Sequence, residues 1–92
     1  MLVTFDYSLS FGKGHSGESY IEIELTDEEY KRLQVAQESG EEFMDCKLVK
    51  DIYDKVYELA DEDATQDLVF EGILDKDRRA SESYLIEVYY PE

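Results

Sequence analysis

Residues 2–25 have the sequence LVTFDYSLSFGKGHSGESYIEIEL, in which two alternating segments flank a glycine-rich stretch. In the first segment, apolar side chains occupy every second position: Val3, Phe5, Tyr7, Leu9 and Phe11. After the glycines the same period of two returns, with Ile21, Ile23 and Leu25 on one face. A period of two is typical of strands that bury one face. We therefore predict a β-hairpin closed by the glycine-rich loop.

The segment after the hairpin carries a helix signature. Thr26 and Glu29 have the spacing of a capping box, in which each side chain binds the backbone N–H of the other residue. Gly40 is placed to end the helix, because glycine readily takes the left-handed conformation of a C-terminal cap. We predict a helix from Asp27 to Ser39, whose thin apolar stripe places it on the surface of the sheet.

A second helix is predicted from Asp45, because apolar residues recur at intervals of three and four across residues 48–60. Within it, Asp51 and Lys55 have the spacing of a helical ion pair. Residues 61–79 fit two structures. One is a short separate helix, which we favour, and the other is a strand.

The chain closes with SYLIEVYY, residues 83–90, an alternating segment that predicts a third strand ended by Pro91. The element order is therefore ββααβ or ββαααβ. It predicts an α+β fold with a small three-stranded, mainly antiparallel sheet made of the N-terminal hairpin and the C-terminal strand. We expect the first strand in the middle and two or three helices packed on one face. Ninety-two residues have room for one core, so we expect a single domain, residues 1–92.

The charge balance restricts the partners. The chain has 24 acidic and 9 basic residues and a net charge of −15. Direct binding of nucleic acid or of an anionic membrane surface needs a basic face, so neither is expected. The apolar runs are also too short to cross a membrane. A basic protein is the partner class that this charge favours, and the chain itself is expected to be a monomer or a homodimer.

Cellular location and catalysis are constrained by a few residues. The start MLVTFDYSLS lacks the features of a signal peptide, and the single Cys46 cannot form an internal disulfide, so we expect a cytoplasmic protein. His15, Ser16 and Cys46 are the conventional nucleophile and base candidates, and their spacing indicates no triad. We therefore predict a non-enzymatic protein without catalytic residues and without a cofactor.

The glycine-rich loop contains the pattern G-x-G-x-x-G, formed by Gly12, Gly14 and Gly17. In dinucleotide-binding folds this pattern must open a helix whose N-terminus meets the phosphates, whereas here a strand follows. We therefore interpret it as a hairpin loop. Lys13 and His15 nevertheless make residues 12–17 a candidate anion-binding loop, since backbone N–H groups in turns bind small anions.

A second candidate ligand site is an acidic ladder. Asp61, Asp63, Thr65 and Asp67 fall at alternating positions, as the oxygen ligands of a calcium-binding loop do. Gln66 and Gly72 stand where such a loop needs its turn glycine and its bidentate glutamate. The ladder therefore gives no designed metal site. A small-ligand or metal-binding domain that uses the glycine-rich loop or this ladder remains the alternative function.

The solvent side of the sheet is the candidate that we favour. The alternation places tyrosines and acids together there, and tyrosine is enriched in protein interfaces while acids attract a basic partner. We predict a protein-interaction module with this surface as its partner-binding face, and a nucleic-acid mimic or inhibitor is one form of the hypothesis. The predicted face comprises Tyr20, Glu22, Glu24, Leu85, Glu87 and Tyr89.

Overall fold

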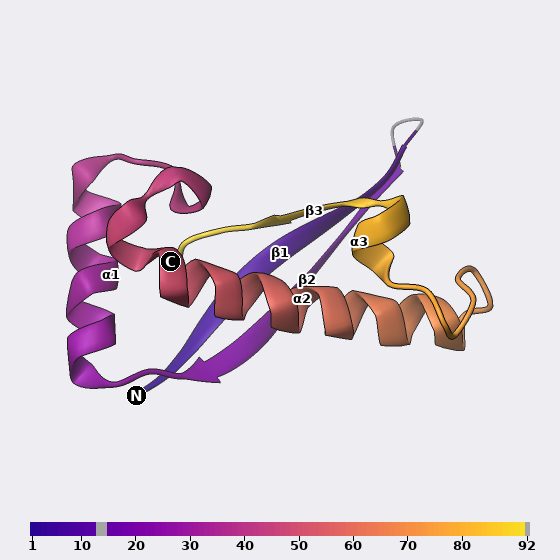
Figure 1. Ribbon diagram of the computed structural model, residues 1–92, viewed down its shortest axis with the longest axis horizontal. Coiled ribbons are helices and arrows are strands. Elements are labelled where there is room, and N and C mark those ends of the chain that lie inside the picture. The colour runs from indigo at the N-terminus through magenta and orange to yellow at the C-terminus, as the bar shows by residue number, and fades with distance from the viewer. Residues whose placement is uncertain (13–14, 92) are drawn as a thin grey trace.

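A computed structural model describes residues 1–12 and 15–91, except for the side chains of residues 11, 12, 15 and 16 (Figure 1). Short 3₁₀ turns, labelled η, separate the first two helices. The elements in chain order are β1 (Leu2–Gly12), β2 (His15–Glu24), α1 (Asp27–Ser39), η1 (Phe43–Asp45), η2 (Lys47–Val49), α2 (Lys50–Phe70), α3 (Ala80–Ser83) and β3 (Leu85–Val88).

The three strands form an antiparallel sheet in the order β2-β1-β3. β1 pairs with β2 through the hairpin, with Phe5 opposite Ile21, and with β3 on its other side, with Ser8 opposite Glu87. Helices pack against this sheet, and α2 crosses it in front of the strands (Figure 1). The predicted α+β class, element order and central first strand are confirmed.

Helix α1 has the predicted bounds because both of its ends are determined locally. The Thr26 hydroxyl accepts from the backbone N–H of Glu29 at 3.1 Å, and the Glu29 carboxylate accepts from the backbone N–H of Thr26 at 2.9 Å. Gly40 ends the helix at φ 80°, a left-handed conformation that favours glycine. The helix stands at one end of the sheet and packs against η2 (Figure 1).

Ion pairs connect α1 to α2. Arg32 donates to both carboxylate oxygens of Asp51, at 2.8 and 2.9 Å, and Lys55 lies 3.6 Å from the Glu29 carboxylate. The predicted pair between Asp51 and Lys55 is therefore wrong. Each of these residues has its partner on α1, because the two helices are close enough for their side chains to meet.

The predicted start of the second helix at Asp45 is also wrong. Residues 43–49 form the two 3₁₀ turns, which bury Phe43, Cys46 and Val49. These apolar residues are spaced by three, which suits the three residues per turn of a 3₁₀ helix. The same spacing also fits one side of an α-helix, so the spacing of apolar residues alone does not distinguish a 3₁₀ turn from an α-helix.

Helix α2 runs without interruption to Phe70, so residues 61–70 form neither the separate helix nor the strand that the sequence allowed. The buried stripe of Val56, Ala60, Ala64 and Leu68 continues at intervals of four and keeps the helix on the sheet. Beyond it, turns follow, with Gly72 at φ 77°.

The core lies between the inner face of the sheet and α2. Phe5 from β1 and Ile52 and Val56 from α2 are completely buried there. Phe43 extends the core toward the end of the sheet, where its ring stacks on Phe5 at 5.9 Å and on Tyr90 at 4.8 Å. The strand side chains that alternate in the sequence therefore point alternately into this core and toward solvent.

Candidate functional site

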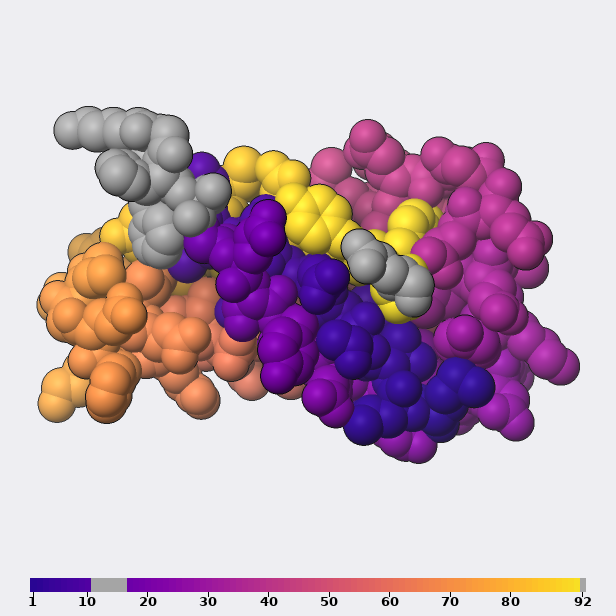
Figure 2. Space-filling model, turned by 180° about the vertical axis from the view of Figure 1, so that it is seen from behind, coloured from indigo at the N-terminus to yellow at the C-terminus, as the bar shows by residue number. Residues whose placement is uncertain are grey.

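Seen from behind, the strands are not covered by any helix of the described residues (Figure 2). The strand register and the exposure place the six residues of the predicted partner-binding face on this side of the sheet. All six are exposed, and the leucine and the two tyrosines each leave 44 % or more of their surface accessible. We call this surface the outer face and define it by the outward-pointing strand residues and Tyr89. They are Leu2, Thr4, Asp6, Ser8, Ser10, Glu18, Tyr20, Glu22, Glu24, Leu85, Glu87 and Tyr89.

The register places the two tyrosines in one row across the sheet. Tyr20 lies opposite Asp6 in the β1–β2 pair, and the backbone N–H of Tyr89 donates to the carbonyl of Asp6 at 3.0 Å. Neighbouring strands are about 4.8 Å apart, so the tyrosine backbones are about 10 Å apart with the aspartate between them. The hydroxyls of Tyr89 and Ser8 are 2.8 Å apart, which fixes the tyrosine ring over the central strand.

Carboxylates surround the tyrosine row, and basic side chains do not. Asp6, Glu18, Glu22, Glu24 and Glu87 are exposed on the outer face. None of the residues of β1, β2 and β3 is Lys or Arg. Of the basic residues, Lys13 lies outside the described residues and the others occur only between positions 31 and 79, in the helices and turns.

Two features of this surface were not part of the predicted site: Glu18 and a hollow between the tyrosines. Glu18 precedes Tyr20 by two positions, so the period of two already placed its side chain on the same face. Asp6 and Glu18 join both tyrosines around an open hollow of about 390 Å³. The hollow depends on the strand register, which the sequence does not specify.

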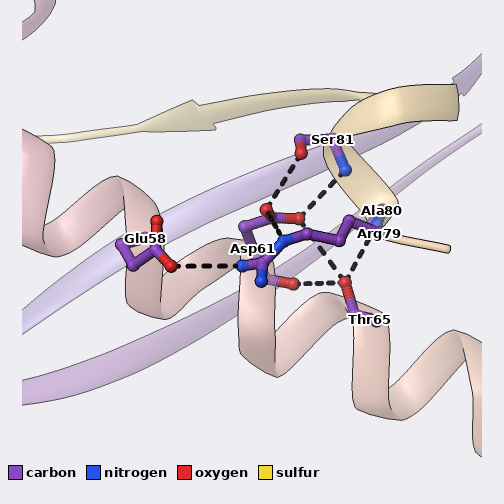
Figure 3. Close-up of polar contacts among 6 residues, drawn as sticks. All are labelled: Glu58, Asp61, Thr65, Arg79, Ala80 and Ser81. Atoms are coloured by element: carbon purple, nitrogen blue, oxygen red, sulfur yellow. Dashed lines mark hydrogen bonds and ion pairs between the residues drawn. The ribbon is translucent and has the colours of Figure 1, made fainter. Parts of the chain in front are cut away.

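Asp61 of the acidic ladder is an internal structural residue (Figure 3). Its carboxylate accepts from Nε of Arg79 at 2.7 Å, from the Ser81 hydroxyl at 2.9 Å and from the Ser81 backbone N–H at 3.0 Å. Burial by itself raises the pKa of this carboxyl, but the ion pair and the bonds from Ser81 outweigh burial and lower the pKa. The cluster fixes α3 against α2.

Asp63 and Asp67 do not join Asp61 around a common point. All three belong to α2, where residues two apart point to different sides of the helix. Asp63 accepts a hydrogen bond from the Tyr7 hydroxyl at 2.7 Å, and burial together with this contact raises the pKa of Tyr7. Within residues 1–12 and 15–91, no group of three acidic, histidine or cysteine side chains has a geometry that could hold a metal ion.

The candidate anion-binding loop can be placed only in part. Gly12 pairs with His15 and Gly17 pairs with Leu9, so the backbone on both sides of the turn belongs to the hairpin. Lys13 and Gly14 lie outside the described residues, as does the side chain of His15. The glycine pattern therefore joins two strands, and no helix follows it.

Cys46 is buried between η1 and η2. A reactive thiol needs access to solvent, which this buried position does not provide. Tyr90 lies beside it, and burial together with the nearby cysteine raises the pKa of Tyr90 to about 12. The thiol therefore belongs to the packing of this end of the sheet.

No family model matches the chain, and neither a curated protein nor a solved structure matches it. Among the residues that the structure describes, no helix combines the length and the apolar character needed to span a membrane.

Proposed function

We propose that the protein is a non-enzymatic interaction module whose outer face binds a basic protein. The observation that carries this proposal is that the outer face holds carboxylates and, among the described residues, no Lys or Arg side chain. Five carboxylates and two tyrosines lie on the outer face, while the described Lys and Arg side chains belong to the helices and turns. The N-terminal ammonium lies 2.8 Å from the Glu24 carboxylate, and the other four carboxylates have no basic side chain on this face. A predominantly acidic surface attracts a basic partner and repels other acidic proteins.

The tyrosines supply contact area that charge alone lacks. Tyr20 and Tyr89 are large and exposed, and each loses few rotatable bonds when it is ordered at an interface. Interface energy usually concentrates in a few such aromatic residues, with charged groups at the rim contributing speed and selectivity of association. We therefore assign anchoring to the tyrosines and attraction to the carboxylates.

A nucleic-acid-binding protein is one basic partner that fits this face. Such proteins present Lys and Arg to phosphates, and a row of carboxylates on one face offers them a similar negative surface. Under this form of the proposal the protein acts as a mimic, and DNA or RNA competes with it for the partner.

A buried, unpaired Cys46 also agrees with the cytoplasmic location that we propose.

The test uses two double variants that change the net charge equally. Immobilised protein is used to isolate basic proteins at low salt, and the affinity of each identified partner is then measured. E22Q/E87Q removes two charges from the outer face, and E38Q/E62Q removes two from exposed helical positions. We expect the first to weaken binding by at least about fivefold and the second by less than about twofold.

The tyrosine pair is tested separately by Tyr20→Ala with Tyr89→Ala. Loss of two interface anchors is expected to weaken binding by about tenfold or more. Equal losses from both charge variants would contradict a binding role for the outer face, as would unchanged affinity after removal of both tyrosines. Absence of competition by DNA or RNA would exclude the mimic and leave a basic protein partner of another kind.

A further inference from the structure

We propose that the partner binds as an extended strand added to the free edge of β3, with its apolar side chains in the groove beside that edge. This inference rests on the proposed function and states how the partner is recognised. β3 is the last strand of the sheet order β2-β1-β3, so one of its edges has no neighbouring strand within residues 1–12 and 15–91 (Figure 1). Addition of a strand to such an edge is a common mode of peptide recognition.

The hydrogen-bonding groups on the free edge follow from the pairing of β3 with β1. The backbone N–H of Tyr89 donates to Asp6, so the backbones of Tyr89, Glu87 and Leu85 face β1. The intervening residues, Ile86 and Val88, therefore direct their N–H and C=O groups away from β1. They offer an incoming strand four hydrogen-bonding groups.

An apolar groove of about 510 Å³ runs beside this edge. One wall of the groove is formed by η1 and the first half of α2. The other wall is formed by β3 and by Tyr89 and Tyr90, which follow it. The main side chains that line the groove are Phe43, Met44, Tyr53, Ile86, Val88 and Tyr90.

The groove is formed by packing that is already present in the free protein. Phe43 stacks on Tyr90 at 4.8 Å and meets the edge of Tyr53 at 5.2 Å, and the Tyr90 hydroxyl donates to the carbonyl of Glu41 at 2.9 Å. Met44 is 60 % exposed at its rim. A site with ordered walls loses little entropy when it binds.

The two sides of an added strand would meet different surfaces. Its residues opposite Ile86 and Val88 point to the helix side, into the groove, and its residue opposite Glu87 points to the outer face. Glu42 adds a second carboxylate at the groove. The occupant that this arrangement selects is a segment in which apolar residues alternate with Lys or Arg.

A second copy of the chain fits the edge poorly. Its own edge strands are β3, with the sequence LIEV, and β2, which ends in YIEIE. Either strand would place Glu side chains against Glu87 or its neighbours, and like charges directly across a strand pair are destabilising. Two chains of net charge −15 also repel one another.

The experiment uses the intact protein and the acetylated, amidated peptide Lys-Val-Lys-Val-Lys-Val-Lys. Two modified peptides carry N-methyl groups either on all the valines or on all the lysines, which leaves the charge unchanged. Binding is followed by NMR through the backbone amide signals. In a strand paired with β3, the N–H groups of alternate peptide residues face β3 and the others face away. Methylation of the set that faces β3 is expected to weaken binding at least about tenfold. Methylation of the set that faces away is expected to weaken binding less than about twofold.

The groove is tested with Met44→Ser against Val35→Ser, which truncates a similarly exposed apolar side chain on α1. We expect the first to weaken binding of the unmodified peptide severalfold and the second to leave it unchanged. On binding, the amides of Ile86 and Val88 should become protected from hydrogen exchange.

Equal effects of the two methylation patterns would overturn strand addition. So would protection confined to β2, or a failure of the unmodified peptide to bind at millimolar concentration. These results would leave the proposed function standing if the captured partner still responds to E22Q/E87Q and not to E38Q/E62Q. Loss of that response as well would overturn both.

Discussion

Asp61 is a charged residue on the buried stripe of α2, and its environment explains why it is tolerated there. The side chain of Asp61 is 6 % exposed, and both carboxylate oxygens accept hydrogen bonds. Its position is unusual already in the sequence, because Asp61 stands four residues after Tyr57 and three before Ala64 on the apolar stripe. The sequence could not have identified Arg79 as the partner, since that contact depends on how residues 71–79 return the chain to α2.

Removal of the Asp61 carboxylate is expected to destabilise the fold. Asp61→Ala leaves the Ser81 N–H and Nε of Arg79 without their acceptor, and we expect a loss of about 2–4 kcal/mol in the free energy of unfolding. The control is Glu58→Ala, which removes the exposed carboxylate 3.5 Å from the same arginine and should change stability little. Urea unfolding measures both, and equal losses would contradict the structural role of Asp61.

The same carboxylate should make stability sensitive to acid. Its pKa is lower in the folded chain, so its stabilisation is complete above the unfolded-state pKa of about 3.9 and is lost as pH falls through the folded-state value. Asp61→Asn removes this contribution. We expect the stability of the Asn variant to fall less than that of the unaltered protein as pH drops below about 4, as measured by urea unfolding at a series of pH values. Parallel pH profiles would refute this assignment.

Among the elements, α1 illustrates when sequence is sufficient. The capping box and Gly40 act within a few residues of the helix ends, so the bounds could be predicted without knowledge of the fold. The start of α2 could not, because it depends on Phe43 reaching the aromatic rings of Phe5 and Tyr90. The end of α2 does have a local cause: Gly72 takes φ 77°, its N–H donates to the Val69 carbonyl at 3.1 Å, and the Ile73 N–H donates to the Leu68 carbonyl at 2.9 Å.

The cap of α1 can be tested without altering the core. Thr26→Ala removes the acceptor for the Glu29 N–H and should reduce the free energy of unfolding by about 1 kcal/mol. Thr26→Ser keeps a hydroxyl at the same place and should retain most of that stability. The difference between the two in thermal or urea unfolding is the relevant quantity, and a serine variant as unstable as the alanine variant would argue against the cap.

Over the whole molecule, the sheet separates a helical layer of mixed charge from an acidic outer face. Sequence alone predicted this face, because the period of two assigns every strand residue to one side and the net charge is visible in the composition. The groove beside β3 could not be predicted, because its walls come from η1, α2 and β3, which are far apart in the chain. Local patterns therefore specified the surface, and only the packing of distant segments specified the groove.

The most direct test of the central claim is to map where a cationic probe binds. An oligolysine of eight residues, added to isotope-labelled protein, should shift the backbone amide signals of β1, β2 and β3 that carry the outer-face acids, above all Asp6, Glu18, Glu22 and Glu87. E22Q/E87Q should reduce these shifts at a given probe concentration, and E38Q/E62Q should not. Shifts concentrated on the exposed acids of α1 and α2, or spread evenly over the protein, would contradict the claim that the outer face recruits a basic partner.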